Sequence, residues 1–301
     1  MHIDKLAVIG VGLIGTSCAL ALRAASAVSH VVGVGRSQAN LDRAEARGAI
    51  DTGVLCNGPW AQEVADADLV LIAIPVAQYR GVLTALADVV TERVVITDAG
   101  STKQDVVLTA RETLKKCLSR FVPGHPIAGS ERSGAEAGDA SLYVGRQVIL
   151  TPLPETSASA FALVADFWTA CGARVARLDP ARHDHILAAV SHLPHLLASA
   201  LVAELASRQD SAEYFGNAGS GFRDFTRIAA APPEMWRDIA LANRDALLKE
   251  LTAYRTALDA LALCIEHGDT GALHGMLTRA AEARRQWSET AGGIAAGTPA
   301  R

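Results

Sequence analysis

The sequence predicts an α/β protein with an N-terminal doubly wound, mostly parallel sheet and a C-terminal all-α domain. Short apolar runs alternate with helical patterns over residues 1–178, and a Gly-rich turn directly follows the first run. From residue 179 onward almost every segment has a helical pattern. Apolar strands separated by helices indicate a parallel sheet covered on both faces. A length of 301 residues fits two domains of about 150 residues each.

The expected elements of the first domain follow one another along residues 1–178. The strands are expected at 6–9, 31–34, 69–74, 94–97, 120–123, 147–151 and 174–178, the last of which should close the sheet. The helices are expected from the Gly-rich turn to about residue 24, and over 37–47, 77–89 and 102–116.

The second domain is expected over residues 179–290 and includes two long apolar helices, 183–207 and 235–263. A helix of a small monomeric lobe normally keeps one polar face in water, and these helices are too apolar for that. We therefore expect this domain to bury much of its surface against another subunit and to form a homodimer. Residues 291–301 are rich in Gly, Ala and Thr and are expected to be a disordered tail.

The composition excludes several classes of function. Lys plus Arg number 28 and Asp plus Glu number 32, a net charge of −4, which argues against a general nucleic-acid binder. The longest apolar stretch, 69–77, is interrupted by Pro75 and is too short to cross a bilayer. Five scattered cysteines without CxxC spacing favour a reduced, cytoplasmic protein. We expect neither a nucleic-acid nor a membrane partner.

The Gly-rich turn has the GxGxxG pattern of a dinucleotide-binding site, between a strand and a helix. Gly10 permits the tight turn, Gly12 lets the pyrophosphate approach the backbone, and Gly15 lets the helix pack on the strand. The helix N-terminus, with Leu13 and Ile14, offers free N–H groups to the phosphates. The first domain is therefore predicted to be a Rossmann-like, dinucleotide-binding domain.

The end of the second strand indicates which dinucleotide binds. An NAD-preferring enzyme usually carries an acidic residue there, whereas this chain has Gly35 followed by Arg36 and Ser37. A guanidinium and a hydroxyl suit the 2′-phosphate of NADP. We therefore predict NADP rather than NAD. In the alternative, Arg36 is a solvated loop residue that stacks on the adenine and leaves cofactor choice loose.

Polar residues also follow later strands, whose carboxyl ends face the ligand crevice in such a sheet. Ile74, Pro75 and Asp98 are expected to contact the cofactor. Three polar segments are expected to border the substrate: 98–103 (DAGSTK), 124–131 (GHPIAGSE) and 191–195 (SHLPH).

Taken together and in order, these segments and others resemble the prephenate/arogenate dehydrogenase family of tyrosine biosynthesis. The further segments are GVGLIGTS, VILTP, GFRDFTRIA and MWRDI, followed by Asn243. The resemblance implies oxidative decarboxylation of prephenate or arogenate, with hydride transfer from ring C4 to NAD(P)+. The ring hydroxyl proton goes to a base, and loss of CO2 makes the ring aromatic. No metal is required.

The resemblance assigns roles to matching residues. His125 is the base, because a neutral imidazole suits proton transfer at neutral pH; otherwise it is a structural histidine that caps the next segment. Ser101 hydrogen-bonds the same hydroxyl, or alternatively caps the following helix. Arg227 binds a substrate carboxylate through its planar fork, with Asp224 holding the guanidinium.

Ser191, His192 and His195 share one helix face and are expected to line the substrate cleft. Pro194 should bend this helix, because it lacks an N–H. Glu131 either gates the cleft or is a solvated carboxylate. Residues expected outside the site are His183 and His185, at the surface or the helix start, and Trp236, in the helical core. A zinc site on the HxxH face is disfavoured, since a third ligand at suitable spacing is missing.

Two alternatives remain open from the residues. The first is a β-hydroxyacid or imine reductase of the same two-domain plan, which would use a lysine in the helical domain. That domain contains only Lys249. The second is a catalytically idle NADP-binding redox sensor, which the retention of His125, Ser101 and Arg227 disfavours.

Overall fold

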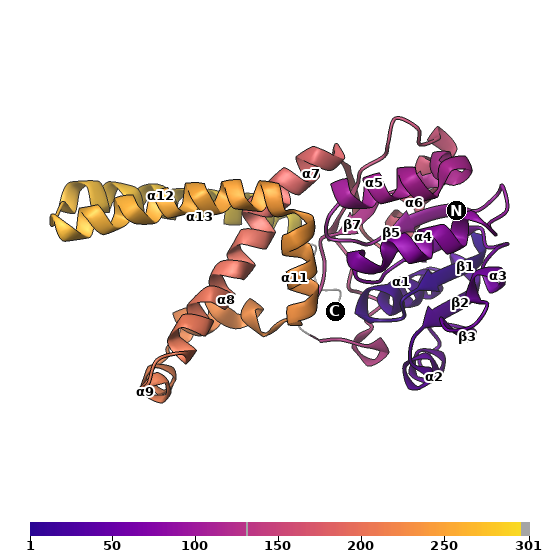
Figure 1. Ribbon diagram of the computed structural model, residues 1–301, viewed down its shortest axis with the longest axis horizontal. Coiled ribbons are helices and arrows are strands. Elements are labelled where there is room, and N and C mark those ends of the chain that lie inside the picture. Colours follow the sequence, from indigo (N-terminus) through magenta and orange to yellow (C-terminus); the bar gives the residue numbers. More distant parts are fainter. Residues whose placement is uncertain (131, 296–301) are drawn as a thin grey trace. The chain divides into compact units, whose positions relative to one another are not determined.

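The computed structural model, shown in Figure 1, describes residues 1–130 and 132–295. The chain divides into two compact units, of which the first is Met1–Arg244 and the second begins at Asp245. The expected boundary at residue 178 marks the change from an α/β to a helical pattern. The observed division falls later, because α7 contacts α5 and α11 contacts η1.

Six strands of the described chain form one parallel sheet in the order β3-β2-β1-β4-β5-β6. They are β1 (Ile3–Ile9), β2 (Val28–Gly35), β3 (Thr52–Leu55), β4 (Leu69–Ile72), β5 (Val95–Asp98) and β6 (Phe121–Val122). This order confirms the predicted doubly wound sheet. The chain reverses its direction of travel between β1 and β4, where such sheets bind ligands. Strand β3 was not predicted.

Helices cover both faces of this sheet (Figure 1). Side chains alternate along β1, so that Leu6 and Val8 belong to one buried core while Ala7 and Ile9 belong to the other. The helical elements of this part are α1 (Leu13–Ala24), α2 (Gln38–Ala46), α3 (Trp60–Glu63), η1 (Val76–Gln78), α4 (Tyr79–Ala87), α5 (Gln104–Thr113) and η2 (Lys115–Arg120).

A second, three-stranded sheet follows the first, and the sequence did not predict it. It contains β7 (Gly124–Pro126), β8 (Gln147–Leu150) and β9 (Arg174–Arg177), with β7 antiparallel to β8. The expected strand at 174–178 therefore closes this sheet and not the main one. Pro123 separates β6 from β7, and proline cannot donate a ladder hydrogen bond. Also in this part are η3 (Ala135–Ala137) and α6 (Ala158–Ala170).

The expected single helix over 183–207 is three consecutive elements. These are α7 (Pro180–Leu187), a π-helical turn η4 (Ala188–His192) and α8 (Leu193–Ala206). The Asp179 side chain accepts hydrogen bonds from the N–H groups of Ala181 and Arg182, which fixes the start of α7. Pro194 has no N–H for the Val190 carbonyl, which explains why the regular α-helical pattern fails just before it.

The remaining helices also differ from the expected single helix over 235–263, which ends and restarts at Asn243. They are α9 (Ser211–Gly216), α10 (Ser220–Thr226), η5 (Arg227–Ala230), α11 (Pro233–Ala242), α12 (Arg244–Glu266) and α13 (Thr270–Ala295). Residues 291–295 are helical, in contrast to the disorder expected for 291–301, and residues 296–301 lie outside the described chain.

The stretch Pro180–Ala206 is long and apolar enough to cross a bilayer by length and composition alone. Three of its polar side chains, His183, Asp184 and His192, are buried within the protein. In this stretch 33% of the most apolar window is buried, and His183 and Asp184 hydrogen-bond other residues of the first unit.

Candidate active site

The glycine turn between β1 and α1 has the geometry that a dinucleotide pyrophosphate requires. Gly10 has φ +102°, and a Cβ there would lie 2.3 Å from the Ala73 carbonyl oxygen and 2.8 Å from Ile74 Cγ2. A Cβ on Gly15 would lie 2.2 Å from the Gly10 carbonyl oxygen. In contrast, a Cβ on Gly12 would meet nothing within 4 Å. The turn is therefore closed towards the protein and open at Gly12.

The N-terminus of α1 fits an anion at that open position. Gly12 is the N-cap, and neither a side-chain cap nor an acidic residue is present in the first turn, which begins with Leu13 and Ile14. The first N–H groups of the helix are thus available to phosphate oxygens. Ile74 and Pro75 follow β4, and Ile74 packs against the Gly10 turn.

Arg36 and Ser37 lie at the end of β2, on the same edge of the sheet as the glycine turn. Both residues are exposed. Ser37 is the N-cap of α2, but its hydroxyl makes no capping hydrogen bond. Within the part of the chain described, Arg36 forms no ion pair. Both side chains can therefore reach a bound nucleotide.

Beneath the loop after β5 lies a fully buried ion pair between Asp98 and Lys103. Lys103 Nζ lies 2.5 Å from Asp98 Oδ2 and 2.8 Å from the Gly124 carbonyl oxygen. The Asp98 carboxylate also accepts hydrogen bonds from the Tyr79 hydroxyl and from the N–H groups of Gly100 and Gly124. Protein donors thus occupy it, so Asp98 supports the loop in place of the direct cofactor contact expected.

His125 lies in β7 and is tied to α7 through its ring. Its Nδ1 is 2.8 Å from Nε2 of His183, whose Nδ1 is 2.8 Å from Asp184 Oδ1. Burial, followed by the nearby His183 and Lys103, lowers the pKa of His125 well below its ordinary value. The imidazole is therefore neutral at pH 7 and able to accept a proton.

His192 is held by Asn243, the residue at which α11 ends. The Asn243 amide nitrogen lies 2.7 Å from the Asp184 carbonyl oxygen and 3.2 Å from His192 Nδ1, so it donates to both. Burial lowers the pKa of His192 to about 4, and the Ser101 backbone lies close enough to affect that pKa. Since Nδ1 accepts, the proton of this neutral ring is on Nε2, which makes no hydrogen bond within the described residues.

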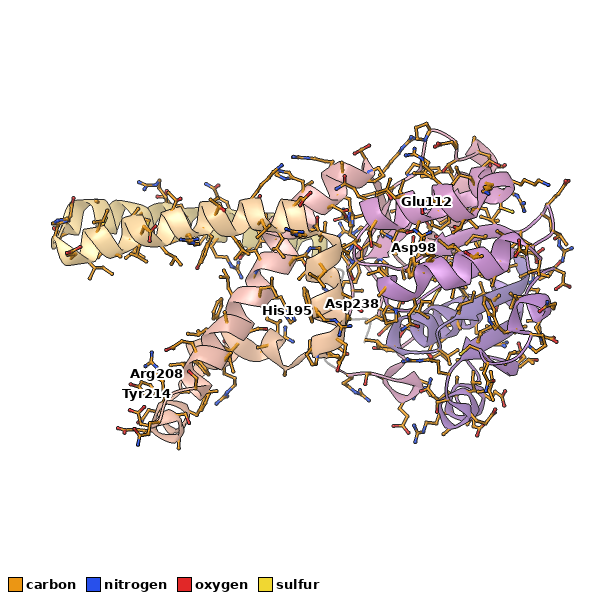
Figure 2. All side chains as sticks on the ribbon, viewed as in Figure 1. Asp98, Glu112, His195, Arg208, Tyr214 and Asp238 are labelled. Carbon is orange, nitrogen blue, oxygen red and sulfur yellow. The ribbon has the colours of Figure 1, made fainter. Side chains whose placement is uncertain are left out.

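His195 on α8, labelled in Figure 2, lies over the Trp236 ring of α11 with ring centroids 3.4 Å apart, a distance and angle typical of stacking. Trp236 therefore borders this histidine group instead of packing in the helical core as predicted. His195 Nδ1 and Trp236 Nε1 are buried and lack a hydrogen-bond partner in the described chain. Buried polar atoms without a protein partner are unusual, so these two atoms are available to hydrogen-bond a ligand.

The structure places the remaining predicted residues less closely around His125. Ser101 and Ser191 are half-buried, in the loop after β5 and in η4 respectively. Arg227 begins η5, is exposed, and lines a surface pocket of about 390 Å³ to which none of the site histidines contributes. Glu131 lies outside the described residues.

Sequence reasoning placed His183 at the surface or the helix start; it lies in the first half of α7 but is fully buried beside His125. Its role depends on Asp184, and the two lie next to each other in the HD pair of the sequence. This His–Asp pair shortly before a long apolar stretch was an available signal. Among the described residues no group of three or more His, Cys, Asp or Glu side chains could hold a metal.

The fold and the glycine turn define a nicotinamide-dependent oxidoreductase with a histidine group next to the cofactor site. A family model described as the prephenate dehydrogenase nucleotide-binding domain matches residues 18–177, and one described as its dimerization domain matches 179–279. The chain belongs to the prephenate dehydrogenase family, which confirms the resemblance found in its motifs.

Comparison with individual relatives supports the same family assignment. The chain is 39% identical to the cyclohexadienyl dehydrogenase of Zymomonas mobilis over 88% of its length and 89% of the relative. It is 34% identical to the prephenate dehydrogenase of Bacillus subtilis over 88% of its length and 71% of the relative.

Solved structures give the same result. Prephenate dehydrogenase from Aquifex aeolicus, in complex with hydroxyphenyl propionate and NAD+, matches with a TM-score of 0.88 and 33% identity over 95% of this chain and 99% of that one. Arogenate dehydrogenase from Synechocystis matches with a TM-score of 0.78 and 29% identity over 94% of this chain and 99% of that one.

Proposed function

We propose that the chain catalyses the oxidative decarboxylation of prephenate, or of arogenate, with NADP+ or NAD+ as the hydride acceptor. The observation that carries this proposal is the buried, neutral His125 beside the dinucleotide edge of the sheet, with its ring held from behind by His183. The related Aquifex enzyme binds both hydroxyphenyl propionate and NAD+, which supports a ring-containing carboxylate as the substrate.

Each residue of the site has a proposed task. His125 accepts the proton of the ring hydroxyl, and Ser101 hydrogen-bonds the same hydroxyl. His192 offers its unpaired Nε2–H to a substrate oxygen, beside Ser191 and His195. Arg227 binds a substrate carboxylate, and Glu131 borders the cleft. The bound nicotinamide supplies the hydride acceptor.

We propose a preference for NADP over NAD. The support is Arg36 and Ser37, both exposed at the end of β2 where an acidic residue would select the ribose hydroxyl of NAD. Arginine forms a bidentate contact with phosphate, which NAD lacks at this position. Steady-state kinetics with both cofactors tests the preference directly.

We propose that the helical part, taken from residue 179 to about 290 as the second domain, forms a homodimer. Large apolar side chains are exposed on α12 and α13, among them Leu258, Leu263, Ile265 and Leu277. Such side chains mark interaction surfaces when they are grouped. Sedimentation of wild type and of Leu263→Glu, a change on this surface, should show a dimer for the former and a weaker one for the latter.

We propose a cytoplasmic location. All five cysteines are free thiols, which fits a reducing compartment. Cell fractionation with a marker enzyme tests this assignment.

The decisive experiment is a four-way comparison of prephenate and arogenate with NADP+ and NAD+, following absorbance of the reduced cofactor. Turnover of one ring substrate confirms the reaction class, and the kcat/KM ratios identify the preferred substrate and cofactor. Absence of turnover with all four pairs, by protein that binds dinucleotide, would contradict the proposal.

A further inference from the structure

We propose that His183 and Asp184 form a closed proton relay behind His125, which holds the substrate proton during the reaction and then returns it. This inference rests on the proposed function. It extends that function by giving two residues of α7 a task in proton transfer, whereas the sequence placed His183 outside the site. The argument depends on which ring nitrogens carry protons, and the hydrogen-bond chain determines these one after another.

The first link is the Asp184 carboxylate. Its Oδ1 accepts from the N–H of Lys103 and its Oδ2 from the N–H of Gln104, each at 2.8 Å, at the start of α5. Burial alone would raise the pKa of Asp184, but hydrogen bonds from His183 and from the Gln104 N–H outweigh it and lower the pKa. The carboxylate is therefore ionised and can only accept.

The second link is His183. Because its Nδ1 lies 2.8 Å from an ionised carboxylate oxygen, Nδ1 must carry a proton. Burial lowers the pKa of His183, so the ring is neutral and its Nε2 has a free lone pair. That nitrogen lies 2.8 Å from His125 Nδ1.

The third link is His125. Since His183 Nε2 can only accept, His125 Nδ1 must donate to it and therefore carries the proton of the neutral ring. The lone pair of His125 is then on Nε2, the only ring nitrogen left for the substrate hydroxyl. When Nε2 takes that proton, Nδ1 can pass its own to His183, and the positive charge then lies next to Asp184.

A proton cannot pass from the relay to solvent through His183 or Asp184. His183 is 0% exposed and Asp184 is 1% exposed, and backbone N–H groups occupy the far side of the carboxylate. The other titratable groups that face the relay are Lys103 and Asp98 below it, His192 on η4 and Asp105 at the start of α5. None of them accepts a hydrogen bond from His183 or His125.

A relay without an exit suits the proton balance of the reaction. The C4–H bond breaks as its electron pair leaves as hydride, the hydroxyl O–H bond breaks, and the proton goes to His125 while the oxygen becomes a carbonyl. The bond from C1 to the carboxylate then breaks, and its electron pair makes the ring aromatic as CO2 leaves. The oxygen becomes a phenolate and takes the proton back, so no net proton is released.

The tautomers can be measured without any activity. Nitrogen-15 NMR of uniformly labelled protein at pH 7.5 should show His125 and His183 both protonated at Nδ1, with His183→Gln and His125→Asn used to assign the signals. A His125 ring protonated at Nε2 would overturn the relay, whatever the activity of the protein.

The kinetic test compares His183→Gln with His185→Gln, a matched change at an exposed histidine of the same helix. A glutamine carbonyl can still accept a hydrogen bond from His125 Nδ1, but it cannot take the proton. We expect kcat to fall about 100-fold in His183→Gln, the lower end of the range for positioned proton transfer, with KM little changed. The control should retain wild-type kinetics.

The number of protons that are transferred in the rate-limiting step provides the second readout. The solvent isotope effect, measured at several fractions of D2O, should vary in a curved, two-proton manner for wild type and linearly for His183→Gln. A purely structural role for His183 would give linear plots for both proteins. Wild-type turnover together with an unaffected His183→Gln variant refutes the relay alone, whereas lack of any wild-type turnover refutes the proposed function.

Discussion

The buried Asp98–Lys103 pair allows a quantitative prediction about stability. Lys103→Met removes the ammonium while keeping most of the side-chain volume, and both partners are fully buried. Removing one partner of a buried pair costs about 3–5 kcal/mol, because the other charge stays behind. Asp98 retains hydrogen bonds from the Tyr79 hydroxyl and the Gly100 and Gly124 N–H groups. We therefore expect a loss near the lower limit, about 3 kcal/mol.

The assay is urea unfolding followed by circular dichroism. At an m-value of about 3 kcal/mol per M, the upper part of the usual range, a loss of about 3 kcal/mol moves the midpoint down by about 1 M. All variants must be compared at one protein concentration, because the homodimer proposed above would make the unfolding midpoint depend on concentration.

The matched control is Arg80→Met, which breaks the exposed ion pair between Arg80 on α4 and Glu112 on α5. Solvent screens that pair, so the loss should be about 0.5 kcal/mol. The double variant Asp98→Asn/Lys103→Met should recover much of the stability, since no uncompensated charge remains. If Lys103→Met costs no more than Arg80→Met, the reasoning about this buried charge is wrong.

Four further predictions concern the site. His125→Asn should lower kcat by about 10²–10⁴-fold with little change in KM, as measured by steady-state kinetics. Arg227→Ala should chiefly raise KM for the ring substrate, and the reverse pair of phenotypes would exchange the two roles. Arg36→Ala should weaken NADP binding far more than NAD binding in calorimetry, and equal losses would disprove a phosphate contact. The pKa of His192 is lower when folded, so stability should fall as pH drops from about 6.5 to about 4, and His192→Gln should show a shallower fall in urea titrations across that range.

The sequence predicted the main sheet well because its signals are local. The glycine turn fixes the first crossover, and β1, β2, β4 and β5 are apolar runs between helices. Strand β3 was missed because Thr52–Leu55 is short and contains Gly53, which is uncommon inside strands.

The second sheet could not be predicted, because it depends on pairing between distant segments. Residues 124–126 (GHP) and 147–150 (QVIL) form an antiparallel pair, which neither segment reveals by itself. Apolar runs show that a strand is buried, but they do not identify its neighbours.

In the candidate site, too, residues marked by a local motif were predicted, whereas residues placed by distant contacts were not. His125 was found through its motif, and its ring does lie among buried histidines. His183 was expected outside the site, at the surface or the helix start, because its burial results from β7 meeting α7, a tertiary contact that its helical position does not indicate. Asn243 was noted in the sequence only as part of the resemblance. Its contact with His192 spans 51 residues and becomes apparent only in the folded chain.

The π-helical turn at Ala188–His192 has a consequence for how this protein can change in evolution. A π-helical turn holds one amino acid more than an α-helical turn, so deleting one residue there would restore a plain α-helix while the helix that follows kept nearly its orientation. His195 would still face Trp236, but the side chains within the turn itself would change place. Related genes should therefore tolerate the loss of one codon at this turn more readily than elsewhere in α7 and α8.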